Sequence, residues 1–136
     1  MADKVAFELV SPTRLLYSDA VDMVVVPGSE GDFGVLPGHA PLISLVRPGV
    51  IDIHDGGKVG ARIFVAGGFA EVVETRCTVL AEEAVPVADI DRAEAESRLS
   101  AARAAAGRAQ TEPERAAAER RILVAEALVE AARPRT

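Results

Sequence analysis

The sequence predicts a β-sandwich of about ten short, mainly antiparallel strands followed by a C-terminal α-helical hairpin. Turn-forming residues interrupt residues 1–86 at intervals of roughly 8–12 positions, and no helical pattern lies between the β-rich segments. Residues 87–136 hold 16 alanines, nine arginines and a single glycine, Gly107. We therefore expect two domains, 1–86 and 87–136, with Pro86 at the boundary.

The expected strands lie between successive turn signals. Their ranges are 5–10, 14–17, 20–26, 33–35, 42–46, 50–54, 62–66, 69–73 and 76–81. Pro27-Gly28 should end the third of these, and Asp55-Gly56-Gly57 is a hairpin signal between the sixth and seventh. Because no helical crossover is available, neighbouring strands should be antiparallel.

The second domain has the signals of two helices. Asp89 or Asp91 can cap the first helix, and Gly107 stands where it should stop. Thr111 to Glu114 match a capping box for the second helix, with Pro113 in its first turn and Pro134 after its end. The expected apolar stripes are Ile90, Ala93, Leu99, Ala102 and Ala106 on the first helix and Ala118, Ile122, Ala125, Val129 and Ala132 on the second. Since alanine buries little area, we expect a weakly held hairpin that can detach.

Charge and composition exclude several classes of function. The net charge is −6 and the isoelectric point is about 4.9, which argues against nucleic-acid binding. Residues 1–86 carry 12 acidic and six basic residues, against nine of each in residues 87–136. The net negative charge thus belongs to the first domain, which favours a basic partner surface. No stretch approaches the roughly 20 apolar residues that span a bilayer, so we expect no direct membrane insertion.

The residues that carry chemistry are few and scattered. With two histidines and one cysteine, we expect no catalytic site and no metal site. Cys77 should be a small core residue on a strand. Glu30 and Asp32 lie in a glycine-rich segment that reads as a tight turn, with an acid–base pair or an acidic interaction tip as the other readings. His39 has a structural or an interface role.

A long motif resembles a known family. The run Gly28-Ser29-Glu30-Gly31-Asp32-Phe33-Gly34-Val35-Leu36-Pro37-Gly38-His39-Ala40-Pro41-Leu42, with Arg47-Pro48-Gly49-Val50-Ile51 and Gly67-Gly68-Phe69-Ala70-Glu71-Val72, resembles the epsilon subunit of F-type ATP synthase, called delta in mitochondria. The resemblance implies a non-catalytic central-stalk subunit of a proton-translocating enzyme that couples the gamma shaft to the c-ring. It also implies a peripheral location at the cytoplasmic face of the bacterial inner membrane.

The same resemblance implies roles for particular residues. Glu30, Gly31 and Asp32 would face the polar loops of the c-ring, and His39 would lie near the contact of shaft and ring. The helices of the family lie folded against the sandwich or extend toward the alpha and beta subunits, and the extended form obstructs ATP hydrolysis.

Some members of the family bind ATP through a motif in the first helix. Ile90, Asp91 and Ala95 match this motif, but Glu94 stands in place of its arginine. A carboxylate there would repel phosphate, so we expect no ATP cofactor by this route. The alternatives are a subunit that acts primarily as an ATP-responsive inhibitor of hydrolysis, and an unrelated ligand-binding β-sandwich protein.

Overall fold

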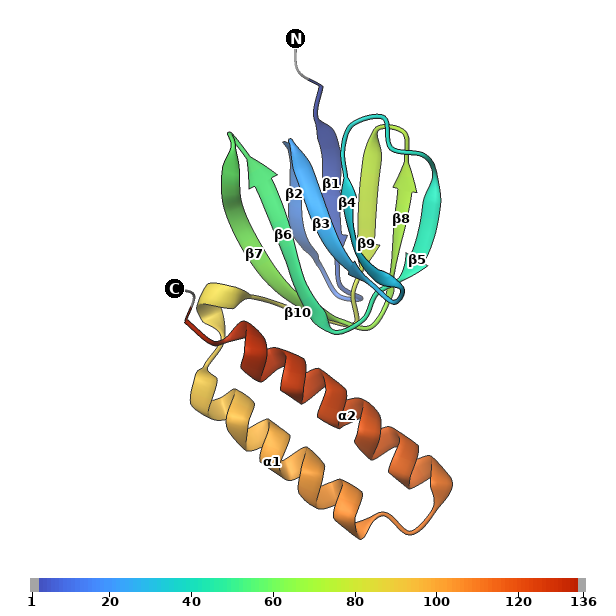
Figure 1. Ribbon diagram of the computed structural model, residues 1–136, viewed down its shortest axis with the longest axis vertical. Helices are drawn as coiled ribbons and strands as arrows, with labels where there is room; N and C mark the ends of the chain where they lie inside the picture. Colours follow the sequence, from blue (N-terminus) through green and yellow to red (C-terminus); the bar gives the residue numbers. More distant parts are fainter. Residues whose placement is uncertain (1–2, 135–136) are drawn as a thin grey trace. The chain divides into compact units, whose positions relative to one another are not determined.

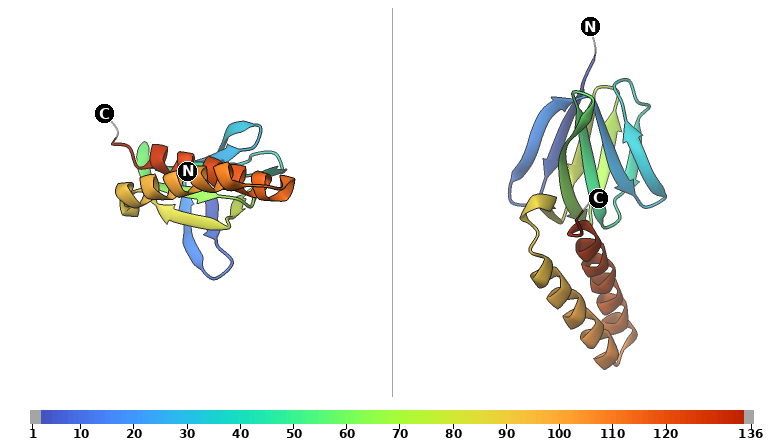
Figure 2. Two further views of the ribbon diagram at one scale, coloured as in Figure 1. Left: turned by 90° about the horizontal axis from the view of Figure 1, so that it is seen from below. Right: turned by 60° about the vertical axis from the view of Figure 1, so that its left-hand side comes forward.

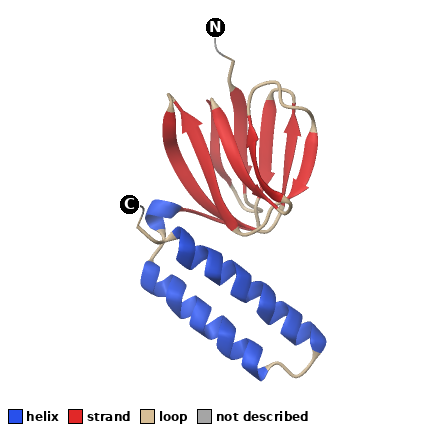
Figure 3. Ribbon diagram, viewed as in Figure 1, coloured by secondary structure: helices blue, strands red, loops and turns tan. Residues whose placement is uncertain are grey.

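The computed structural model describes residues 3–134, and the chain folds as two compact units that divide between Pro86 and Val87. The strands lie in the first unit and the two α-helices in the second (Figure 3). The predicted class, a β-sandwich followed by a helical hairpin, is confirmed.

Two five-stranded sheets make up the first unit (Figure 1). One has the strand order β2-β1-β9-β8-β5 and the other β10-β7-β6-β3-β4. Of the paired strands, β1 and β9 are parallel and the others are antiparallel. The strands are β1 Val5–Val10, β2 Leu15–Val21, β3 Met23–Gly28, β4 Gly31–Val35, β5 Leu42–Leu45, β6 Gly49–Asp55, β7 Lys58–Ala66, β8 Phe69–Val73, β9 Arg76–Leu80 and β10 Glu83–Pro86.

The core lies between the sheets and follows from alternation along the strands. In β1, Val5, Phe7 and Leu9 are buried while the residues between them face outward. Branched aliphatic side chains fill most of the remaining core, in line with an aromatic content of only 4%. Cys77 is fully buried in this core, as expected for a small apolar residue, and burial raises the pKa of its thiol to about 12.

Several strand limits differ from the sequence-based expectation. β2 runs without a break to Val21, and the chain turns at Asp22 instead of at residues 18–19. Pro27 and Gly28 are the last two residues of β3, so the strand ends where they predict, although both still pair with β4. The four-residue β10 was not expected, since it is short and ends in Pro86; it pairs with β7.

Glycine permits two of the turns that shape the sandwich. Gly56 and Gly57 have φ angles of 65° and 80°, as a tight hairpin between β6 and β7 requires, and the predicted hairpin is confirmed. At Gly68 the φ angle is 94° and an added Cβ would lie 1.8 Å from the carbonyl oxygen of Leu80. The chain can therefore pass from β7 to β8 this close to β9 only without a side chain at position 68.

The second unit begins with a 3₁₀ turn at Val87–Asp89, followed by α1 (Arg92–Arg108) and α2 (Glu112–Ala131). The helices lie side by side in the views of Figures 1 and 2. Asp91 caps α1 by accepting a hydrogen bond from the Glu94 amide, at 3.1 Å. Thr111 caps α2 by accepting one from the Glu114 amide, at 3.2 Å, which confirms the predicted cap. The Glu114 carboxylate reaches back to the Thr111 hydroxyl and to the Gln110 amide, one residue before the amide that a complete capping box uses.

The end of α1 and its buried stripe differ from the expectation. Gly107 lies within α1 at a negative φ, and the helix ends at Arg108 with Ala109 as an extended cap. Ala95 is buried in place of the expected Ala93, which is exposed. The change from Ala93 to Ala95 follows from the side of α1 that packs against α2, and α1 ends one residue beyond Gly107, within the usual variation of a helix end. The buried residues of the two helices are Ala95, Ala102, Ala118, Ala125 and Leu128.

Candidate interaction site

The turn between β3 and β4 is an acidic tip, which we define as Gly28 to Asp32. Gly28 pairs with Gly31, so Ser29 and Glu30 form the turn, and Gly31 has a φ angle of 130°. An added Cβ at Gly28 would lie 2.8 Å from the ring of Phe33, so that ring packs directly against the base of the turn. The tight turn expected from the sequence is present, but Asp32 belongs to β4 and not to the loop.

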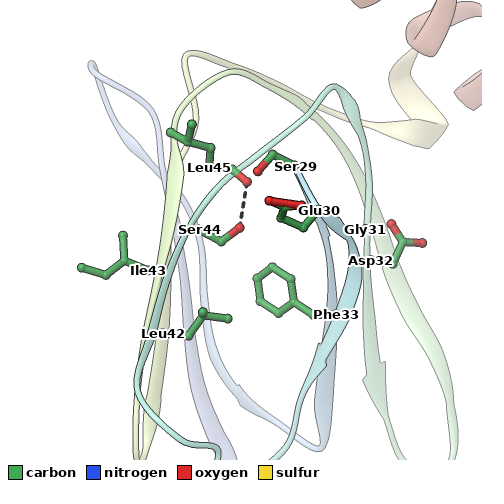
Figure 4. Close-up of a pocket in the computed structure, with 9 residues that line it drawn as sticks. All are labelled: Ser29, Glu30, Gly31, Asp32, Phe33, Leu42, Ile43, Ser44 and Leu45. Atoms are coloured by element: carbon green, nitrogen blue, oxygen red, sulfur yellow. Dashed lines mark hydrogen bonds between the residues drawn. The ribbon is translucent and has the colours of Figure 1, made fainter.

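The two carboxylates of the acidic tip have different surroundings. Asp32 forms an ion pair with Arg47, with 2.5 Å between Oδ1 and Nη2. Within the described part of the chain, residues 3–134, Glu30 forms no ion pair. In Figure 4, Glu30 points toward β5 and Asp32 points away from it. Only Glu30 therefore offers an unpaired negative charge at the tip.

A groove separates the acidic tip from β5. It has a volume of about 470 Å³ and runs between the edge strand of each sheet, β4 and β5. Phe33 and Leu42 point into it from opposite sides (Figure 4). The Ser29 amide donates to the carbonyl oxygen of Leu45 at 2.9 Å, which ties the tip to the end of β5. The lining residues are Ser29, Glu30, Gly31, Asp32, Phe33, Leu42, Ile43, Ser44 and Leu45.

An apolar row crosses the outward face of the sheet β2-β1-β9-β8-β5, and it begins at Leu45 beside the acidic tip. One residue from each strand contributes, and each is the direct cross-strand partner of the next. In order from β5 to β2, the apolar row is Leu45, Phe69, Leu80, Val10 and Leu15. Exposed fractions are 68% for Leu45, 42% for Phe69, 36% for Leu80 and 57% for Leu15.

The apolar row is the feature that the sequence-based reading missed. Each of its members stands at the end of a strand, where a single apolar residue next to a turn has no distinctive pattern. The apolar row can be recognised only once the strand register is known. Its five residues are far apart in the sequence, but the register places them next to one another in a single row across the sheet. A row of exposed apolar side chains of this kind is a candidate surface for contact with another protein.

His39 lies away from the acidic tip. It is in the loop from β4 to β5, at the opposite end of β4 (Figure 1). Its amide donates to the Leu36 carbonyl at 3.1 Å, and its Nδ1 is 2.6 Å from the Ala40 carbonyl oxygen. The Gly38 amide donates to the Glu74 carbonyl at 3.0 Å, which holds the loop against the turn from β8 to β9. A single partner could contact both His39 and the acidic tip only if it extended along the whole length of β4.

The residues that match the family's ATP motif lie at the start of α1. Asp91 is used as the helix cap, Ala95 is buried and Ile90 is half-buried. Glu94 is exposed in the first turn, near the positive end of the helix. Two carboxylates thus occupy the position where an anionic ligand of a helix N-terminus would bind.

A second charged cluster lies at the far end of the sandwich. Lys4 Nζ is 2.5 Å from Asp55 Oδ1 and 3.2 Å from Asp22 Oδ1. The amide of Gly56 and then the Lys4 ammonium lower the pKa of Asp22 below its usual value of 3.8. Hydrogen bonds from Lys4 to Asp55 and to Asp22 raise the pKa of Lys4. This cluster joins the N-terminal segment to the β6–β7 hairpin.

The described residues show two further negative results. Among residues 3–134, no group of three or more His, Cys, Asp and Glu side chains is arranged to hold a metal ion. No helix in this range is both long and apolar enough to cross a membrane. The acidic tip, the groove and the apolar row are surface features that suit contact with a protein.

Comparisons with known proteins give a consistent result. The family described as the ATP synthase delta/epsilon chain β-sandwich domain matches residues 4–87. The ATP synthase epsilon chain of Paramagnetospirillum magneticum is 61% identical over 131 residues, 96% of this chain and 98% of the relative. That of Rhodospirillum rubrum is 56% identical, also over 131 residues, 96% of this chain and 98% of the relative.

Solved structures resemble the fold of this chain. One chain in the mitochondrial ATP synthase of Euglena gracilis, a structure of OSCP, F1 and c-ring, matches with a TM-score of 0.83 and 26% identity, covering 96% of this chain and 82% of that chain. A chain in the central stalk and c-ring structure of the Tetrahymena thermophila enzyme has the same fold, with a TM-score of 0.67 and 16% identity, over 97% of this chain and 98% of that one.

Proposed function

Since this chain belongs to the ATP synthase epsilon-chain family, we propose that it joins the gamma shaft of the rotor to the c-ring without chemistry of its own. It is a rotor-stalk subunit of an F-type ATP synthase. Within that role, the gamma subunit packs against the apolar row and the polar loops of the c-ring meet Glu30 at the acidic tip.

The apolar row and the acidic tip meet at Leu45, and this contact is the main support for the proposal. Leu45 begins the apolar row, and its carbonyl oxygen accepts the hydrogen bond from Ser29 of the tip. The chain thus offers one continuous surface with an apolar centre and an acidic rim, the usual composition of a protein interface. Such a surface can hold two partners at once, which a coupling between shaft and ring requires.

The location follows from the complex. As a subunit of a membrane-bound synthase, the chain is proposed to lie as a peripheral protein at the cytoplasmic face of the bacterial inner membrane. The net negative charge of residues 1–86 supports attachment to basic surfaces of partner subunits.

Reconstitution tests this function. Inverted membranes with ATP synthase depleted of this subunit are titrated with the purified chain, and ATP-driven proton pumping is measured. Wild-type chain should restore pumping, and Glu30→Lys should raise the half-saturating concentration by about tenfold, because it reverses a rim charge. Asp19→Lys, the same charge change on the distant strand β2, is the matched control. Failure of the wild-type chain to bind or to restore pumping would refute the function.

A second role, regulation of ATP hydrolysis by the helices, is proposed from the thin contact between them. Four of the five buried helical residues are alanines, and Leu128 is the fifth. Alanine contributes little burial energy, so extension of the hairpin toward the alpha and beta subunits costs little. Hydrogen exchange in the isolated chain tests this: amides of α1 and α2 should exchange much faster than those of β1 and β9. Equal protection would contradict a separable hairpin.

The helix start gives no support to regulation through bound ATP. Glu94 and Asp91 place two carboxylates in the first turn of α1, where they repel phosphate. Calorimetry with ATP and Mg²⁺ should give no binding in the micromolar range, and Glu94→Arg is the variant that restores the family's residue. Clean micromolar binding by the wild-type chain would overturn this part of the proposal.

A further inference from the structure

The acidic tip and the crossover from β5 to β6 form one block, joined by backbone hydrogen bonds. The Ser29 amide donates to the Leu45 carbonyl and the Arg47 amide donates to the Pro27 carbonyl, both at 2.9 Å. Between them, Gly28 and Val46 form an isolated antiparallel bridge. This crossover carries the chain from one sheet to the other. It therefore lies along the base of the acidic tip.

The side chain of Arg47 adds a second attachment between the same two segments. Its Nη1 donates to the carbonyl oxygen of Gly28 at 2.7 Å, and its Nη2 donates to Asp32 Oδ1 at 2.5 Å. Gly28 precedes the turn and Asp32 follows it, so one guanidinium spans both sides of the turn that presents Glu30. A planar guanidinium can make two such bonds at once with little loss of freedom, whereas an ammonium offers a point charge.

We propose that Arg47 and Asp32 are positioning residues of the docking surface, which hold the acidic tip rigid so that Glu30 alone meets the partner. The proposal rests on the function proposed above and departs from one expectation of the sequence analysis. By the family resemblance, Asp32 would face the c-ring with Glu30 and Gly31. Here Asp32 acts through Arg47 and does not touch the partner, in keeping with its direction away from the groove in Figure 4.

A charge exchange distinguishes positioning from contact. The variants Asp32→Arg and Arg47→Asp each place two like charges together, and each should raise the half-saturating concentration for restored proton pumping by about tenfold. The double variant D32R/R47D rebuilds the attraction in reverse and leaves the net charge of the chain unchanged. It should return the concentration to within about threefold of wild type, since the lost bond to Gly28 is not rebuilt. Lys58→Asp, the same charge change as Arg47→Asp but at the β6–β7 hairpin, is the control.

The outcome of this exchange decides the proposal. If the double variant is as weak as Asp32→Arg alone, the Asp32 carboxylate meets the partner directly and the proposal is overturned. If the wild-type chain itself does not restore pumping, the proposed function fails, and the positioning role is then decided by a second measurement on the isolated full-length chain.

That second measurement is backbone NMR relaxation. In wild type the Gly31 amide should have an order parameter near about 0.85, typical of rigid backbone, and in Arg47→Ala it should fall below about 0.6. Arg47→Lys should give an intermediate order parameter, because a lysine keeps the positive charge but lacks the planar guanidinium that bonds Gly28 and Asp32 together. The Phe7 amide in β1 reports whether the fold is intact. An unchanged Gly31 order parameter in a folded Arg47→Ala chain would also overturn the proposal.

Discussion

Removing the two ends of the apolar row should separate docking from folding. Leu45 is 68% exposed and Leu15 is 57% exposed in the chain on its own. We propose the changes Leu45→Ser and Leu15→Ser, alone and together. Both side chains lie mostly in water before docking, so their loss should weaken attachment to the gamma subunit far more than it weakens the fold.

The exposed fractions set the size of the effect. Complete burial of a leucine side chain stabilises by about 1.5–3 kcal/mol. Leu45 then has about 1–2 kcal/mol to gain on docking and Leu15 about 0.9–1.7 kcal/mol, in proportion to their exposure. The two strands are separated by three others, so Leu45 and Leu15 lie roughly 19 Å apart and their losses should be additive. The midpoints of the two ranges add to about 2.8 kcal/mol. That sum is about a hundredfold loss of affinity.

Calorimetry of the purified gamma subunit with each variant gives the affinity, and urea unfolding of the chain alone gives the stability. The stability should change by no more than about 1 kcal/mol. Leu36→Ser is the control, since Leu36 is 54% exposed but lies outside the apolar row. If Leu15→Ser binds as tightly as wild type, the shaft does not cover the whole row and the inferred contact is too large.

Four further predictions concern the fold itself. Gly68→Ala should cost at least about 2 kcal/mol in urea unfolding, because the new Cβ meets the Leu80 carbonyl at a positive φ; Gly107→Ala, in open space within α1, should instead stabilise the helix by about 0.5–1 kcal/mol. The Cys77 thiol, whose pKa burial raises to about 12, should react with a disulfide reagent at pH 8 only through opening of the fold, and reaction at the rate of a free thiol would contradict this. Because the pKa of Asp22 is lowered in the folded chain, its contribution to stability is present above pH 3.8 and is lost as the pH falls through the folded value; Asp22→Asn should flatten that part of the acid unfolding curve, and an unchanged curve would be the contrary result.

Local patterns predicted most of the elements. The helix cap at Thr111 and the hairpin at Gly56-Gly57 depend on neighbouring residues, and both are confirmed. The predicted limits of β2 were wrong, because strand pairing overrides local signals, and α1 ends one residue beyond Gly107, within the usual variation of a helix end. The strand β10 was not predicted, because it forms by pairing with β7 and not from a local sequence pattern.

For the site, the sequence and the structure contributed different parts. The class of fold, the tight acidic turn at Glu30 and the family could be predicted from the sequence, because each depends on residues that are adjacent or regularly spaced. The ion pair of Arg47 with Asp32 and the apolar row could not be predicted in this way and emerge from the folded chain. The physical reason is register: five strands, distant along the chain, bring their single apolar ends into one row only when their hydrogen bonds fix which residues stand opposite each other.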